Sequence, residues 1–155
     1  MQLSRGCRQW WLVLPPIAID RICKIIALNS LADGPVTAIP GVLSWAFVKN
    51  TGAAFGILAG SWLLPLLTFA LMAALLVYLL RRPDAPGLMR AGLWIIIGGG
   101  LGNLYDRIVY GYVIDFIRLD FVNFAVFNPA DVFVCAGAAL ALLSILISER
   151  RKGNA

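Results

Sequence analysis

Residues 93–116 read LWIIIGGGLGNLYDRIVYGYVIDF. An apolar run typical of a membrane-spanning helix passes into four glycines, continues with an amide and a charged pair, and ends on an aspartate between apolar residues. Small residues let membrane helices approach one another closely. Ionisable groups beside a membrane span are costly, so by default they suggest a functional site. The segment therefore predicts a tightly packed membrane helix with a polar site at one end.

The composition supports a membrane protein over a soluble one. The 155 residues are 61% hydrophobic and 14% charged, with a mean hydropathy of +0.85. Soluble domains average about 45–50% apolar and about 25% charged residues. We expect a single integral membrane domain over residues 1–155, mainly α-helical and monomeric.

The net charge of +5 does not indicate nucleic-acid binding. The basic residues form short clusters between apolar runs, without the basic stripes that nucleic-acid surfaces need. The chain has three cysteines without metal-type spacing and no histidine. We therefore expect no zinc site and no histidine-based triad.

Four apolar segments are long enough to cross a bilayer, which takes about 20 residues. They cover about residues 10–28, 62–80, 88–104 and 130–147. Eight of the thirteen Lys and Arg residues lie before the first segment, between the second and third, or after the fourth: Arg5, Arg8, Arg81, Arg82, Arg90, Arg150, Arg151 and Lys152. The positive-inside rule then puts both termini in the cytosol and the loops 29–61 and 105–129 on the outer face.

The outer loops are predicted to form a small β-containing extracytoplasmic subdomain. Residues 41–58, GVLSWAFVKNTGAAFGIL, suggest one or two short strands with a turn at NTG, on the membrane surface. Residues 110–119, YGYVIDFIRL, alternate in the same way. Residues 120–128, DFVNFAVFN, are amphipathic and too short to span, which favours an interfacial element.

Polar residues in the first span and first loop each allow two interpretations. Asp20 and Lys24 are four residues apart and can pair on one helix face, with Arg21 beside them. They form either a local ion pair, with Lys24 reaching to the interface, or a support for a neighbouring polar site. Asn50 and Gly52 are either ordinary turn residues or part of that site.

The polar end of residues 93–116 carries Asn103, Asp106 and Arg107 on one helix face. Asp106 and Arg107 could simply form an interfacial salt bridge. Asp115 is harder to explain structurally, because its neighbours are apolar and nothing adjacent in the sequence neutralises it.

A second carboxylate, Asp131, precedes the fourth span, where it would lie in the first helical turn with Asn128 as the N-cap. The helix dipole there favours an ionised side chain. Two carboxylates at one interface suggest aspartic-protease chemistry, since a close pair with Asp115 would share one proton. Which of the two acts as the initial base is not decided by the sequence.

These residues resemble the lipoprotein signal peptidase (signal peptidase II) family over nearly the whole chain. DRICK is similar to its Asp-x-x-Ser/Thr-Lys element, NTGAAFG to Asn-x-Gly-x-Ala-Phe, and GGGLGNLYDR to Gly-Gly-x-x-Gly-Asn-x-x-Asp-Arg. VIDF and FNPAD resemble the elements that hold the catalytic pair. Cys23 replaces the usual Ser or Thr, and the interval between Asp115 and Asp131 is somewhat short.

The resemblance implies an aspartic endopeptidase of the bacterial cytoplasmic (inner) membrane with its active site at the outer face. It would remove signal peptides from diacylglyceryl-modified prolipoproteins just before the lipidated cysteine, among membrane lipids, and would be inhibited by globomycin. Asp115 and Asp131 would be catalytic, and the resemblance implies no metal or cofactor. The implied supporting and substrate-binding residues are Asp20, Lys24, Asn50, Gly52, Asn103, Asp106, Arg107, Asn128 and Ala130.

Two other functions compete with this one. A transporter or channel subunit would use Asp20, Asp106 and Asp115 as a cation path, but it predicts acids near the bilayer midplane rather than on one face. A prepilin peptidase-like aspartyl protease would have its acids on the cytoplasmic side, against the distribution of Lys and Arg.

Overall fold

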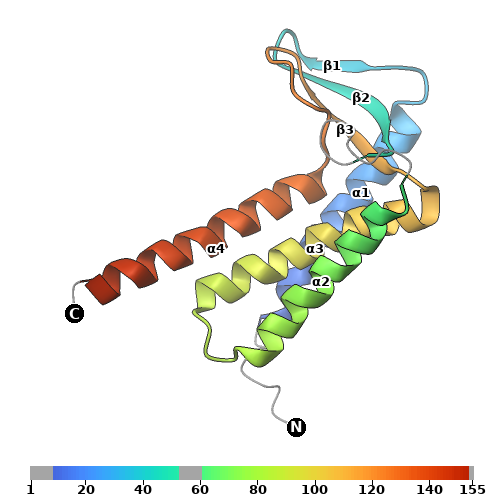
Figure 1. The fold of residues 1–155 in the computed structure, drawn as a ribbon. Coiled ribbons are helices and arrows are strands. Elements are labelled where there is room, and N and C mark those ends of the chain that lie inside the picture. Colours follow the sequence, from blue (N-terminus) through green and yellow to red (C-terminus); the bar gives the residue numbers. More distant parts are fainter. Residues whose placement is uncertain (1–8, 53–60, 154–155) are drawn as a thin grey trace.

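The computed structural model describes residues 9–52 and 61–153. Their elements, in chain order, are the 3-10 helix η2 (Trp10–Val13), α1 (Leu14–Ser30), β1 (Val36–Ile39), β2 (Leu43–Asn50), α2 (Leu63–Arg81), α3 (Gly87–Tyr110), β3 (Val113–Leu119) and α4 (Pro129–Gly153). The chain is mainly helical with one small sheet, as predicted. The sheet lies at one end of the helices, and α4 ends away from it (Figure 1).

Helix α3 is the centre of the bundle because its glycines admit each of the other helices. A Cβ on Gly99 would lie 2.6 Å from the Ala130 carbonyl oxygen of α4, and one on Gly98 would lie 2.7 Å from the Val13 carbonyl oxygen. A Cβ on Gly100 would collide with Met72 of α2. Separations this short leave no room for a side chain on α3, so its backbone packs closely against the backbone at Val13 and in α4 and against the Met72 side chain of α2.

The same close packing continues toward the other end of α3. A Cβ on Gly92 would lie 2.5 Å from the carbonyl oxygen of Gly137 in α4, and the reverse distance is also 2.5 Å. Two glycines facing each other allow the two helices to cross with almost no gap. The position of α4 relative to α3, and therefore of Asp131, is fixed by this pair and by Gly99.

Two of the described helices are long and apolar enough to cross a membrane, Leu63–Arg81 and Pro129–Gly153. Only 17% of the most apolar 18-residue window of each helix is buried, whereas a core helix of a soluble protein is mostly buried. Helix α1 has only 17 residues, and α3 carries glycines and a polar end. The prediction of four spans is therefore supported in part, while the orientation in the membrane remains a prediction.

The three strands form an antiparallel sheet in the order β1-β2-β3. NTG makes a turn at the end of β2, where the Gly52 N–H donates to Asn50 Oδ1, but the turn between β1 and β2 was not predicted: these strands are joined through Gly41, whose φ is 71°. Gly41 permits a left-handed conformation that other residues rarely adopt. The sheet packs on α1 through a cluster of Ala27, Leu31, Ile114 and Phe116.

Helix α3 extends six residues beyond the predicted span and then turns directly into β3. Gly111 ends the helix with φ 79° and donates its N–H to the Arg107 carbonyl. This left-handed C-cap reverses the chain within two residues. As a result, the polar end of α3 lies directly beside the first residues of β3, and the two parts of residues 93–116 face each other.

Candidate active site

A buried ionic cluster joins α1 and α3. Lys24 is fully buried, and its ammonium lies 2.9 Å from Asp20 and 2.7 Å from Asp106. Asp106 also accepts from Arg21 at 2.6 Å and from the backbone N–H of Ile114 at 3.2 Å. Buried charges persist only when they are paired and hydrogen-bonded. The two acids and two bases pair their charges, so the predicted Asp20–Lys24 pair is one part of a four-membered cluster.

Lys24 also reaches Asn103, and this contact fixes the orientation of an amide. Its Nζ lies 2.9 Å from Asn103 Oδ1. An ammonium has three donors and no acceptor, so the amide atom facing it must be the oxygen. The NH2 group of Asn103 therefore points the other way, where it donates to Asp131 Oδ1 at 2.7 Å.

Asp131 lies in the first turn of α4 and forms a reciprocal cap with Asn128. The Asp131 N–H donates to Asn128 Oδ1 at 3.1 Å, and the Asn128 N–H donates to Asp131 Oδ2 at 3.2 Å. This is the geometry of a capping box, with Pro129 at the first helical position. Both Asp131 oxygens therefore accept hydrogen bonds, one from the Asn103 side chain and one from the Asn128 backbone.

Asp115 lies in β3 and is only 1% exposed. Its Oδ2 accepts from Asn50 Nδ2 at 2.8 Å and its Oδ1 accepts from Asn128 Nδ2 at 2.6 Å. Burial raises the pKa of Asp115 to about 6; the two amide donors oppose the rise, and Asp131 adds to it. Asn128 thus contacts both carboxylates, one through its side chain and the other through its backbone.

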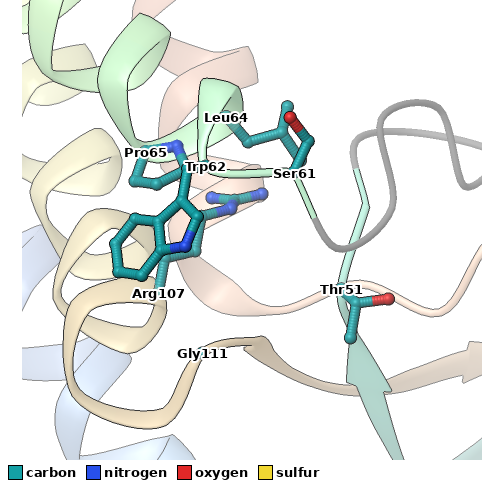
Figure 2. Close-up of a pocket in the computed structure, with 7 residues that line it drawn as sticks. All are labelled: Thr51, Ser61, Trp62, Leu64, Pro65, Arg107 and Gly111. Atoms are coloured by element: carbon teal, nitrogen blue, oxygen red, sulfur yellow. The ribbon is translucent and has the colours of Figure 1, made fainter.

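Asn50 and Arg107 both hold Gly52, two residues after the end of β2. Asn50 Oδ1 accepts from the Gly52 N–H at 3.0 Å, and Arg107 donates to the Gly52 carbonyl at 3.2 Å. The NTG sequence therefore does make a local turn, and that turn points the Asn50 amide at Asp115. Arg107 also lines a cavity of about 210 Å³, together with Trp62, just before α2, and Leu64 and Pro65 of α2 (Figure 2).

A larger cavity of about 640 Å³ opens onto both carboxylates. Its polar lining consists of Asn50, Gly52, Asn103, Arg107, Asp115 and Asp131. The rest is apolar and comes mostly from residues 124–127 and from the first three turns of α4. An apolar cleft with a few convergent polar groups is the usual form of a binding site.

The family of the chain follows from comparison with known proteins. The sequence model of the family described as "Signal peptidase (SPase) II" matches residues 12–147. The chain belongs to the signal peptidase II family. Membership in this family makes it a protease that acts on signal peptides.

Individual relatives are similar in sequence to this chain over most of its length. Proteins named lipoprotein signal peptidase are 37% identical in Streptococcus agalactiae, over 89% of this chain and 90% of the relative, and 39% identical in Streptococcus pyogenes, over 89% and 91%. The relative of that name in Clostridium novyi is 38% identical over 84% of this chain and 91% of its own.

Solved structures of bacterial membrane enzymes share the fold. One, determined at 2.3 Å by the in meso method, has a TM-score of 0.82 and 28% identity, covering 92% of this chain and 89% of that one. Another, at 1.9 Å, has a TM-score of 0.77 and 27% identity, covering 88% and 90%. The helices and sheet of this chain therefore have the arrangement of a bacterial membrane enzyme.

The predicted signal peptidase II residues come together at the sheet end of the bundle. Ala130 contributes through its backbone, because its N–H donates to Asp20 Oδ1 at 3.2 Å. Among the described residues, Asp106 forms no salt bridge with Arg107 and pairs instead with Arg21 and Lys24. The simple interfacial pair considered for Asp106 was therefore wrong.

Arg21 is the contact that sequence reasoning left out of the site. It bonds Asp106 at 2.6 Å and belongs to the buried cluster. Its position inside an apolar segment, next to Asp20, was the available signal. Ala54 and Phe55 of the NTGAAFG motif lie outside the described residues.

Proposed function

We propose that the protein is a membrane aspartyl endopeptidase that removes signal peptides from diacylglyceryl-modified bacterial prolipoproteins, cutting just before the lipidated cysteine. The observation that carries this proposal is the pair of Asp115 and Asp131 on one cavity, linked through Asn128. Membership in the signal peptidase II family and relatives named lipoprotein signal peptidase support it.

The two carboxylates have different surroundings, which suggests different roles. Asp131 accepts hydrogen bonds on both oxygens at a helix N-terminus, so it is the better carrier of the negative charge. Burial raises the pKa of Asp115 to about 6, so it is the better holder of the shared proton. Their titration belongs to the pair rather than to either residue.

Hydrolysis then proceeds in two steps, each with two proton transfers. Asp131 takes a proton from water while the water oxygen attacks the scissile carbonyl carbon, and Asp115 gives its proton to the carbonyl oxygen. In the resulting gem-diol the C–N bond breaks. Asp131 returns its proton to the leaving nitrogen, and Asp115 recovers one from a gem-diol hydroxyl. The pair ends in its starting state, as in other aspartyl proteases.

The supporting residues position this pair rather than react. Asn50, Asn103 and Asn128 direct donors at the two carboxylates, and the cluster around Lys24 holds Asn103. Gly52 and Arg107 shape the cavity wall. A substrate anchored by its acyl chains in lipid and by its signal helix against the spans would bring the peptide bond to this depth, which makes the attack effectively unimolecular.

The proposed location is the bacterial inner membrane, with both termini cytosolic and the cavity at the outer face. We propose that the protein acts as a monomer, with the lipidated prolipoprotein and membrane lipids as partners. We expect it to bind globomycin in the 640 Å³ cavity.

A cleavage assay tests the proposal. Purified protein in lipid or detergent is incubated with a diacylglyceryl-modified prolipoprotein and with the same precursor lacking the lipid. We expect cleavage of the lipidated precursor alone, before the modified cysteine, and its loss when globomycin is added. Equal cleavage of the unlipidated precursor would contradict the proposed substrate class.

A further inference from the structure

A strip of aromatic and basic side chains crosses the outside of α1, α3 and β2, and the proteolytic mechanism does not use it. Arg21 lies 4.7 Å from the centre of the Tyr105 ring. Tyr105 contacts Tyr110 at a centroid distance of 6.3 Å, and Tyr110 contacts Tyr112 at 6.1 Å. Lys49 closes the series, 5.2 Å from the Tyr112 ring. We name these five residues the cation–tyrosine strip.

The strip is accessible, and it carries an unneutralised charge. Tyr105 is 47% exposed and Tyr110 is 40% exposed, and Lys49 is exposed near the end of β2. Lys49 takes part in none of the salt bridges found among the described residues, whereas Arg21 is already paired with Asp106. Arg21 therefore holds Tyr105 in place by stacking, and Lys49 supplies the free positive charge.

The position of the strip along α3 indicates which part of the bilayer contacts it. Eighteen residues separate Gly87 from Tyr105, a rise of about 27 Å along a helix at about 1.5 Å per residue. The hydrocarbon core of a bilayer is about 30 Å thick. If α3 begins near one boundary, Tyr105 lies close to the other, at the depth where tyrosines meet lipid headgroups.

The neighbouring surface is apolar in the direction of the bilayer core. Leu101 lies on the same side of α3 as Tyr105, one turn before it, and is 37% exposed. On α1, Leu14 lies about two turns before Arg21 and is 52% exposed. Hydrocarbon chains fit these residues, and the phosphate of the same lipid fits the cation and phenol groups beyond them.

We propose that the cation–tyrosine strip binds an anionic phospholipid, with its phosphate at Lys49 and the tyrosine hydroxyls and its acyl chains on the exposed apolar face of α1 and α3. This site is distinct from the catalytic cavity, since none of the five strip residues lines that cavity. The proposal concerns lipid binding alone, so its test does not depend on whether the proposed proteolysis is correct.

Thermal unfolding of the full-length protein in micelles supplemented with phosphatidylglycerol or phosphatidylcholine tests the site. A ligand that binds only the folded state raises the midpoint in proportion to the logarithm of its concentration. We expect a larger rise with phosphatidylglycerol, and loss of roughly half or more of that preference in Lys49→Gln and in Lys49→Gln/Tyr105→Leu. The single variant keeps the test valid if the double variant does not fold.

Arg118→Gln is the matched control, because it removes the same charge from the same sheet. Arg118 is already paired with Asp120 at 2.9 Å, so the preference for the anionic lipid should persist. A wild-type protein that does not distinguish the two lipids would overturn the proposal, as would full preference in Lys49→Gln. Equal stabilisation by soluble glycerol phosphate would rule out a lipid as the occupant.

Discussion

The ammonium of Lys24 donates to the side-chain oxygen of Asn103 at 2.9 Å, although the two residues are 79 positions apart in the sequence. This one contact turns the Asn103 NH2 group toward Asp131. A buried cation on α1 thereby orients a donor on α3 that stabilises a carboxylate on α4. The polar network is continuous across three helices, so changes far from the carboxylates should alter them.

Removing the Lys24 charge should destabilise the fold strongly. Lys24→Met leaves the buried carboxylates of Asp20 and Asp106 with one cation fewer, and breaking a buried ion pair costs about 3–5 kcal/mol. Thermal or denaturant unfolding in detergent measures the loss. Lys152→Met is the control, because its 3.2 Å pair with Glu149 is exposed and such pairs contribute less than about 1 kcal/mol. Equal effects of the two substitutions would show that the buried cluster is not needed for stability.

The carboxylate pair should behave as one catalytic unit. Asp115→Asn and Asp131→Asn each remove the shared-proton chemistry, so each should lower the cleavage rate by at least about 10³-fold, and the double variant should be hardly worse. Rates of precursor cleavage by purified protein measure this. Asp33→Asn and Asp84→Asn, at exposed positions, should leave the cleavage rate nearly unchanged. Substantial cleavage by either dyad variant would contradict the aspartyl mechanism.

Loss of the Asn50 amide should shift the pH profile of cleavage to higher pH. Asn50 donates to Asp115 and holds the pKa of that carboxyl down, so Asn50→Ala raises it above its present value of about 6. The proton on Asp115 is then retained to higher pH, and the alkaline limb of kcat/KM moves up.

The activity of Asn50→Ala should also fall about 10- to 100-fold, the usual cost of a hydrogen bond to a charged group. Thr37→Ala, on the exposed face of β1, is the control and should leave the profile unchanged. A shift of the alkaline limb to lower pH would mean that Asp115 does not carry the proton.

The glycine contact between α3 and α4 should be needed for both stability and activity. In Gly99→Ala the new Cβ would lie 2.6 Å from the Ala130 carbonyl, next to Asp131, so α4 must move. Overpacking of this kind costs about 1–3 kcal/mol. Gly87→Ala is the matched control, since its Cβ meets nothing closer than 4.0 Å. The prediction fails if Gly99→Ala has the melting temperature and cleavage rate of Gly87→Ala.

The basic ends of the helices should face the cytosol. Single cysteines replacing Arg82 or Arg150, both exposed, should resist an impermeant thiol reagent in intact spheroplasts when the native cysteines are absent. A cysteine at Thr37, in the sheet at the other end, should react. Ready labelling at position 82 or 150 from outside would reverse the orientation and the side of the cavity.

Most of the helical framework was predictable, because it depends on local features of the sequence. Apolar runs of about 20 residues define helices, and their bounds differ from the predicted spans mainly at the ends. The strand around Asp115 followed from alternation, and the cap at Asn128 from residue type. The turn at Gly41 was missed, because NTG has equally good turn chemistry and only strand pairing distinguishes the two.

The sequence by itself determined which residues could form the site, since charges and amides in an apolar chain are too costly to be there without partners. Only the tertiary structure decided which residues pair with one another. Asp106 pairs with Arg21 and Lys24 rather than with its neighbour Arg107, because the glycines of α3 bring α1 close enough for buried charges to meet. Adjacent side chains on a helix point in different directions, so the partner in space is set by packing and not by proximity along the chain.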